Sequence, residues 1–329
     1  MKISLTKIEA QSITALAILA IVGIFYIHSV NEDIRSAEML EQEIEAYQES
    51  IKPYLNLALN ATSFSIYNAD KKEFVYKKNA EQIMPLASLA KVMSAIVVLE
   101  NTTPLHVFTI EKESIGEIGD NGLLLAEKWP RDAFLRFMLL SSSNDAVHQM
   151  ALEVGKIIDP ASSNAAETFV DALNAKAKEM NLRTMIFNNE SGLDVTLPTL
   201  TVGTPLPASV RAELNGAYSN ARDMTKLFAY AIKTYPDIFS VTSKKTLEIS
   251  SLDKTHTAIN TNPIVEEIDG IIASKTGFTN LSGGNLIVAV PGRNGETMIV
   301  VVLGSTFDER FNDIKTLSGA VTGGGAKPQ

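Results

Sequence analysis

The sequence predicts an α+β fold, in which an antiparallel sheet carries helices on its faces. Segments with strand character come first and last along the 329-residue chain, and a block of helical segments lies between them. This order favours a sheet whose edges come from both ends of the chain. Hydrophobic residues make up 45% of the chain, which is enough for a globular core.

The first element is an apolar segment near the N-terminus. Residues 13–30, ITALAILAIVGIFYIHSV, contain no Asp, Glu, Lys or Arg. A helix of this length spans roughly 27 Å, close to the hydrocarbon thickness of a bilayer. Lys2 and Lys7 favour a cytoplasmic tail at residues 1–12. We expect a single-pass transmembrane anchor in the cytoplasmic membrane, with the rest of the chain on the extracytoplasmic side.

A cleaved signal peptide is the alternative for this segment. Such a peptide needs small residues at a cleavage site just after the apolar run. Residues 31–35, NEDIR, offer no such pattern, which favours an uncleaved anchor. Residues 31–54 are polar with apolar residues near helical spacing, and Pro53 is expected to end this helix. We interpret them as a helical stalk.

The remaining elements lie in residues 55–320, and residues 321–329 form a flexible tail. Two strands are predicted at 63–68 and 73–77. Five helices follow, at 87–100, 130–140, 144–154, 167–180 and 221–234. Three strands at 271–276, 285–290 and 298–303 and a helix at 307–318 complete the region.

Composition excludes several classes of function. The net charge is −9 and there is no long basic run, so we expect no nucleic-acid partner. The chain has no cysteine, which excludes disulfides, thiol catalysis and zinc–thiolate sites. Its four histidines are scattered without metal-ligand spacing, so we predict no metal, no cofactor and no Ser-His-Asp triad.

The main candidate for chemistry is Ser88-Leu89-Ala90-Lys91. On a helix, positions i and i+3 share a face, so the lysine amine can reach the serine hydroxyl. A serine becomes a good nucleophile when a base takes its proton, and a lysine serves if burial favours its neutral form. The same spacing occurs at Ser4–Lys7 and Ser251–Lys254, but only Ser88 opens a long apolar helix.

Two further motifs follow in order. Ser142 and Asn144 lie between two predicted helices. A hydroxyl at this place can relay a proton and an amide can orient a substrate. The alternative is that these residues cap a helix, as serine and asparagine often do. Lys275-Thr276-Gly277 lies at the end of a predicted strand, where an amine and a hydroxyl could hold a carboxylate. Each motif alone is weakly specific, whereas the ordered set is the signature of penicillin-recognising serine hydrolases.

The chain here resembles the low-molecular-mass penicillin-binding proteins, the serine-type D-alanyl-D-alanine carboxypeptidases. The resemblance covers roughly residues 55–320. Beyond the three motifs, it extends to the segments FNNESGLD at 187–194, SNARDM at 219–224 and DG at 269–270. It implies a β-lactamase/transpeptidase-like fold, with an antiparallel sheet flanked by helices and a helical subdomain.

The resemblance also implies roles for the site residues. Ser88 would be the nucleophile and Lys91 its general base, with Ser142 assisting proton transfer. Asn144 would hold the peptide. Lys275, Thr276 and Gly277 would bind the terminal carboxylate, and the backbone N–H groups of Ser88 and Phe278 would form the oxyanion hole. The substrates would be peptidoglycan stem peptides, and β-lactam antibiotics would be covalent inhibitors.

The chain departs from the family pattern at three places. Ser143 replaces a usual glycine, and Phe278 stands where a histidine is common. Four residues, 271–274, separate Asp269-Gly270 from Lys275, so the register of this strand is open.

Several alternative functions remain open on the sequence. DD-endopeptidase action uses the same chemistry as carboxypeptidase action. A class A-like β-lactamase shares the three motifs and adds a glutamate that activates water, for which Glu190 is the nearest candidate. A non-catalytic peptidoglycan-binding module is the third alternative.

Overall fold

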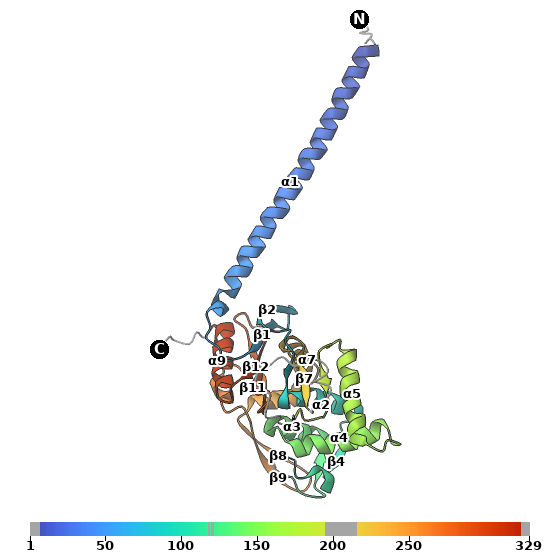
Figure 1. The fold of residues 1–329 in the computed structure, drawn as a ribbon, viewed down its shortest axis with the longest axis vertical. Coiled ribbons are helices and arrows are strands. Elements are labelled where there is room, and N and C mark those ends of the chain that lie inside the picture. The colour runs from blue at the N-terminus through green and yellow to red at the C-terminus, as the bar shows by residue number, and fades with distance from the viewer. Residues whose placement is uncertain (1–6, 118, 120–121, 195–215, 324–329) are drawn as a thin grey trace. The chain divides into compact units, whose positions relative to one another are not determined.

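The computed structural model describes residues 7–117, 119, 122–194 and 216–323 (Figure 1). The chain divides into two compact units, residues 1–56 and residues 57–329. The first unit contains one helix, α1 (Lys7–Leu55), which continues without a break through the expected anchor and stalk. Pro53, which was expected to end this helix, lies inside it, and the helix ends two residues later at Leu55.

Most side chains of the apolar segment at 13–30 lie outside the described part of the structure. Among the described residues, no helix is both long enough and apolar enough to span a bilayer. The helix α9 extends to Thr322, so the first two residues of the tail expected at 321–329 are helical. Residues 324–329 lie outside the described ranges.

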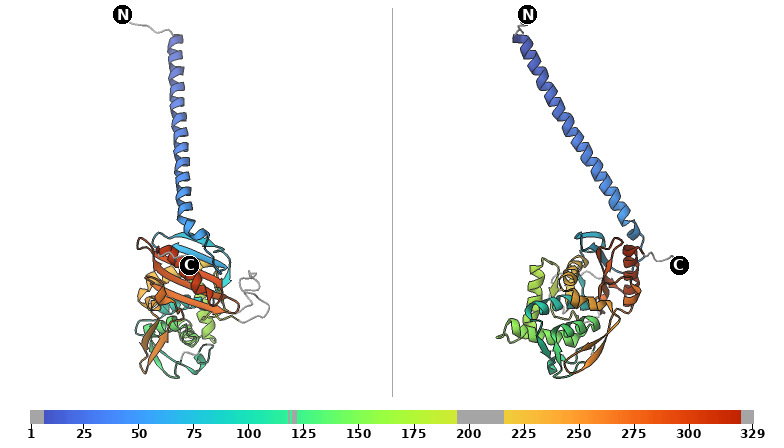
Figure 2. Two further views of the ribbon diagram at one scale, coloured as in Figure 1. Left: turned by 90° about the vertical axis from the view of Figure 1, so that its left-hand side faces the viewer. Right: turned by 180° about the vertical axis from the view of Figure 1, so that it is seen from behind.

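The second unit is built on a five-stranded antiparallel sheet. Its strand order is β10-β11-β12-β1-β2. The strands are β1 (Ser63–Asn68), β2 (Glu73–Lys78), β10 (Ala273–Thr279), β11 (Gly283–Pro291) and β12 (Thr297–Ser305). The early strand β1 pairs with the late strand β12 along its whole length, and the two lie side by side in Figure 2. The predicted sheet with edges from both ends of the chain is confirmed.

Helices cover both faces of this sheet (Figure 1). The helix α7 (Ala221–Thr234) packs against β1 and β12, and α9 (Glu309–Thr322) packs against β11 and β12. Ile299 and Val301 belong to the main hydrophobic cluster. Val300 and Val302, which alternate with them along the strand, are buried on the opposite face. Burial on both faces explains why β12 is an unbroken apolar run.

The middle of the chain forms a helical subdomain. Its main helices are α2 (Lys91–Asn101), α3 (Arg131–Ser141), α4 (Asn144–Ile158) and α5 (Ala165–Glu179). Short elements join them, namely β3 (Met84–Pro85), β4 (Val107–Thr109), η2 (Lys112–Ser114), β5 (Lys128–Pro130), β6 (Ile186–Phe187) and β7 (Ala217–Ser219). Towards β10 the chain adds α8 (Pro236–Phe239), η3 (Ser240–Ser243), β8 (Thr246–Ser250), β9 (Thr255–Ile259) and η4 (Val265–Glu267).

Two predicted elements differ from the structure. The helix expected at 87–100 begins as a 3₁₀ turn, η1 (Ala87–Ala90), and becomes α-helical only from Lys91. The strand expected at 271–276 is shifted towards the C-terminus. Asp269-Gly270 forms a turn, and the first hydrogen bond to the neighbouring strand runs from the Ile272 N–H to the Ala289 carbonyl. Lys275 therefore lies in the middle of β10 and not at its end.

Asn285 of β11 fixes the segment that precedes Ser88 onto the sheet. Its side-chain amide is buried and donates to the carbonyl oxygens of Pro85, at 2.9 Å, and Leu86, at 3.1 Å. Its side-chain oxygen accepts from the Gly304 N–H at 2.9 Å. One side chain thus satisfies three buried backbone groups and joins β11, β12 and the turn η1.

Replacement of Asn285 by alanine is expected to lower the free energy of unfolding by about 3 kcal/mol. The Gly304 N–H loses its acceptor and the Pro85 and Leu86 carbonyls each lose a donor, although the Leu86 carbonyl keeps the bond from the Leu89 N–H. Urea unfolding followed through the fluorescence of the buried Trp129 measures this loss. The exposed Asn312 is the matched control, and its replacement by alanine should change stability by less than about 0.5 kcal/mol. Equal effects of the two replacements would contradict the role of Asn285.

Candidate active site

Ser88 lies in the turn η1, which packs against strand β10. Ala87 has a φ of 49°, so the chain bends sharply before the serine. A Cβ atom on Gly277 of β10 would lie 2.8 Å from the Leu86 carbonyl oxygen and 3.2 Å from the Ser88 nitrogen. Glycine at this position lets the strand and the turn come together, and the Ser88 N–H therefore lies beside β10.

Lys91 is the centre of the site. Its side chain is fully buried, and its Nζ donates to Ser88 Oγ at 2.9 Å, Asn144 Oδ1 at 2.7 Å and the Ser191 carbonyl at 3.1 Å. Burial lowers the pKa of the Lys91 amine to about 7, although the negative charges of Glu190 and Glu117 act in the opposite direction. A large fraction of this amine is therefore neutral at pH 7 and able to accept the Ser88 proton.

The connection between α3 and α4 brings the second motif to the same place. Ser142 adopts the left-handed conformation with φ 59° and ψ 31°, and it ends α3. Ser143 caps α4, since its Oγ accepts from the Ala146 N–H at 3.1 Å. The capping role thus belongs to the middle residue, which leaves Ser142 facing Lys275 and Asn144 facing Lys91.

Strand β10 supplies the third motif in a defined register. Lys275 pairs with Ile287 and Gly277 with Asn285, which answers the question left by the spacing after Asp269-Gly270. The buried Lys275 Nζ donates to Ser142 Oγ at 2.7 Å and to the Thr276 carbonyl at 2.9 Å. Burial, and then the positive charges of Lys91 and Arg310, hold the pKa of Lys275 well below its usual value. The amines of Lys275 and Lys91 therefore lie close enough to influence each other.

The two remaining predicted residues of β10, Thr276 and Phe278, follow this lysine along the strand. Thr276 is buried, and its hydroxyl is hydrogen-bonded to the Thr261 hydroxyl. The Phe278 side chain is 40% exposed and packs edge-on against Phe307, with ring centres 4.8 Å apart. Only its backbone continues the row of site residues along the strand, directly after Gly277.

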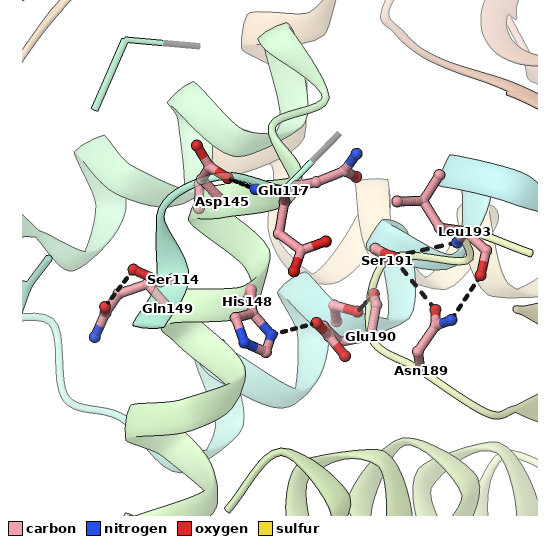
Figure 3. Close-up of polar contacts among 12 residues, drawn as sticks. Ser114, Glu117, Asp145, His148, Gln149, Asn189, Glu190, Ser191 and Leu193 are labelled. Carbon is pink, nitrogen blue, oxygen red and sulfur yellow. Dashed lines mark hydrogen bonds and ion pairs between the residues drawn. The ribbon is translucent and has the colours of Figure 1, made fainter. Parts of the chain in front are cut away.

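A loop after β6 closes the site from the side of Lys91. Asn189 holds the loop in shape, because its Oδ1 accepts from the Gly192 N–H and its Nδ2 donates to the Leu193 carbonyl, both at 2.7 Å (Figure 3). Gly192 has a φ of 78°, and a Cβ atom there would lie 2.0 Å from the Ala87 carbonyl oxygen. The resemblance marked this segment in the sequence, but it gave no sign that the Ser191 carbonyl accepts a hydrogen bond from Lys91.

The Ser-x-x-Lys sequence at Ser251–Lys254 is not a comparable site. Ser251–Lys254 is the turn of the β8–β9 hairpin, in which the Ser251 hydroxyl accepts from the N–H groups of Asp253 and Lys254. The Ser251 hydroxyl itself donates to Glu127 at 2.6 Å. Of Ser4–Lys7, residues 4–6 lie outside the described part of the chain.

Comparison with known proteins agrees with this geometry. The sequence profile of the peptidase family described as D-alanyl-D-alanine carboxypeptidase matches residues 48–306. The chain belongs to this family.

Curated relatives of the family are similar at modest identity. D-alanyl-D-alanine carboxypeptidase DacF of Bacillus subtilis is 26% identical over 262 residues, which are 77% of this chain and 60% of the relative. The chain thus spans less than two thirds of that protein. The D-alanyl-D-alanine endopeptidase of Escherichia coli is 27% identical over 246 residues, covering 73% of this chain and 70% of the relative.

Solved structures share the fold. Penicillin-binding protein D2 from Listeria monocytogenes, in its ampicillin-bound form, is 28% identical with a TM-score of 0.64, covering 81% of this chain and 99% of that one. A D-alanyl-D-alanine carboxypeptidase from Mycobacterium tuberculosis is 19% identical with a TM-score of 0.66, covering 83% and 94%. The second likeness concerns the fold alone. The predicted penicillin-binding fold, a mixed α/β fold like that of β-lactamases, is confirmed.

Proposed function

We propose that this chain is a serine-type D-alanyl-D-alanine carboxypeptidase, which removes the terminal D-alanine from peptidoglycan stem peptides through an acyl-enzyme on Ser88. The proposal is carried by one observation. A buried amine with a pKa of about 7 donates a 2.9 Å hydrogen bond to the hydroxyl of a part-exposed serine, which is the arrangement of a nucleophile and its base.

In the acylation step, the neutral Lys91 amine takes the proton of Ser88 Oγ while this oxygen attacks the carbonyl carbon between two D-alanines. The backbone N–H groups of Ser88 and Phe278 hold the negative oxygen that forms, and each such donor typically contributes about 3 kcal/mol. The proton passes to the leaving amine through Lys91 or Ser142. D-alanine departs, and water then cleaves the ester on Ser88.

The carboxylate of the departing D-alanine binds to Lys275 and Thr276. Lys275 is buried among positive charges, so its ammonium form is disfavoured in the free protein. A substrate carboxylate brings the missing negative charge and favours protonation of the amine. Because Ser142 accepts from the Lys275 Nζ, carboxylate binding also orients the hydroxyl that assists proton transfer.

DD-endopeptidase action is the second candidate. Several relatives at 26–27% identity carry the name D-alanyl-D-alanine endopeptidase. The same groups would cleave a D-alanine bond to a second stem peptide, so the two activities differ only in what the site admits beyond the cleaved bond. For the class A-like β-lactamase alternative, Glu190 is the candidate base, and its carboxylate is paired with His148. The hydrogen-bonded Ser88 and Lys91 argue against a non-catalytic module.

Mass spectrometry after incubation with penicillin is expected to find one covalent adduct on Ser88, which persists because water is poorly activated. Ser88→Ala should lose both the adduct and the release of D-alanine from a pentapeptide. Ser251→Ala, which alters another Ser-x-x-Lys sequence, should keep both. An adduct on Ser88→Ala would contradict the assignment of the nucleophile. Rapid release of the drug would favour a β-lactamase. Cleavage of cross-linked dimers, without release of D-alanine from the pentapeptide, would favour an endopeptidase.

The rate of penicillin acylation is expected to increase as the pH rises through about 7 and to level off above it. Only the neutral Lys91 amine accepts a proton, and its pKa is about 7. An ordinary lysine, with a pKa of about 10.4, would place this rise more than three pH units higher. Stopped-flow measurement with a fluorescent penicillin between pH 5 and 10 tests the assignment, and a midpoint near 10 would contradict it.

The proposal includes a single-pass membrane anchor at residues 13–30, with the peptidase unit on the extracytoplasmic side. It is supported by the uncharged apolar sequence and by Lys2 and Lys7 before it. The full chain should stay with membranes after alkaline extraction, and deletion of residues 1–30 should release it in a form that still binds penicillin. A mature N-terminus near residue 31 would instead indicate a cleaved signal peptide.

A further inference from the structure

A buried His–Glu pair lies beside the site, outside the three motifs. Nδ1 of His148, on α4, lies 2.7 Å from Oε1 of Glu190, in the loop after β6 (Figure 3). The two side chains are only 19% and 11% exposed. The mechanism proposed above uses neither residue.

Backbone contacts of Glu190 and of the next residue, Ser191, join this loop to the helix and the amine of the base. The Glu190 carbonyl accepts from Ser94 Oγ at 2.7 Å, and Ser94 lies three residues after Lys91 on α2. The next carbonyl along the chain, that of Ser191, accepts from the Lys91 amine at 3.1 Å. The side chain and the backbone of Glu190 are thus held by α4 and α2, and the loop presents its carbonyl to the amine from a fixed position.

Charged groups face this pair and the base from several elements. The Lys91 amine is influenced by Glu190 and by Glu117, and it acts in turn on the neighbouring Lys275. His148 is influenced by Glu190, Glu117 and Glu113. Glu117 is brought near by Asp145 of α4, whose Oδ1 accepts from the Glu117 N–H at 2.8 Å. Of the two acidic groups that act on Lys91, Glu190 has the stronger influence and the deeper burial.

We propose that Glu190 is a positioning residue that sets the pH at which the Lys91 base works, and that His148 keeps its carboxylate ionised. The proposal rests on the proposed function of Ser88 and Lys91. Burial alone would make the amine too weak a base, because the ammonium form would be strongly disfavoured. A fixed negative charge beside the amine opposes this effect and keeps the base matched to neutral pH.

His148 helps to keep the Glu190 carboxylate ionised. Burial raises the pKa of the Glu190 carboxyl, but the hydrogen bond with His148, a backbone hydrogen bond and the positive charges of His148 and Lys91 together outweigh burial and bring the pKa below its usual value. The hydrogen bond with Glu190 raises the pKa of His148, against the effect of its own burial. Below its pKa, protonated His148 offsets part of the Glu190 charge that Lys91 experiences. Above it, the Glu190 charge acts on Lys91 without that offset.

The test is the pH dependence of Ser88 acylation by a fluorescent penicillin in Glu190→Gln. Gln keeps the shape of the side chain and removes the charge. The midpoint of the rise in rate should move to lower pH, because the amine loses a negative charge that favours its protonated form. The rate at high pH should fall, because the amine becomes a weaker base. Glu113→Gln, an exposed residue not among the groups that act on Lys91, should leave the midpoint in place.

His148→Gln separates charge from packing. It keeps an amide donor for Glu190 and removes the positive charge, so the midpoint should stay at the wild-type value or move to higher pH. A uniform fall in rate without a shift in Glu190→Gln would overturn the proposal, and so would a downward shift in His148→Gln. Failure of the wild-type protein to take the label on Ser88 would instead refute the proposed function itself.

Discussion

Burial of the Lys91 amine is the constraint on which the rest of the site depends. An amine removed from water is costly unless its protons find acceptors. Ser88, Asn144 and the Ser191 carbonyl supply three, from three separate stretches of chain. The same burial that turns a lysine into a base therefore requires η1, the α3–α4 connection and the loop after β6 to meet at one point.

Each acceptor has its own local support. Ser143 caps α4 and so fixes the direction of Asn144. Asn189 and Gly192 shape the loop that carries Ser191. Asn285 holds the segment before Ser88 against the sheet. The groups that meet at the amine are thus positioned by neighbours with no chemical role in the proposed reaction, and the geometry follows from backbone hydrogen bonds more than from the motif side chains.

Much of this could be predicted from the sequence, because the relevant signals are local. Strand β1 and the apolar runs of β11 and β12 follow from hydrophobic pattern, and α7 was predicted to the residue. Seven of the eight predicted site residues stand in three motifs, and Phe278 directly follows the last of them. The structure brings those motifs together. The β8–β9 hairpin was missed because its strands are short and largely polar. Strand β10 was predicted to begin directly after the turn at Asp269-Gly270, whereas two further residues separate the turn from the strand. The roles of Ser191, Glu190 and His148 depend on contacts between distant segments, and no local pattern encodes such contacts.

The pairing of β1 with β12 has a consequence for how the protein is made. Thr62 and Gly304, which are hydrogen-bonded at this junction, are 242 positions apart in sequence. A sheet closed by such distant partners cannot form on the ribosome until β12 has emerged, and the entropy of closing so large a loop slows its folding. Because η1 is held by β10 and β11, the cleft around the nucleophile can assemble only after these two strands have emerged. A truncated product of translation would carry Ser88 and Lys91 and still lack an assembled cleft.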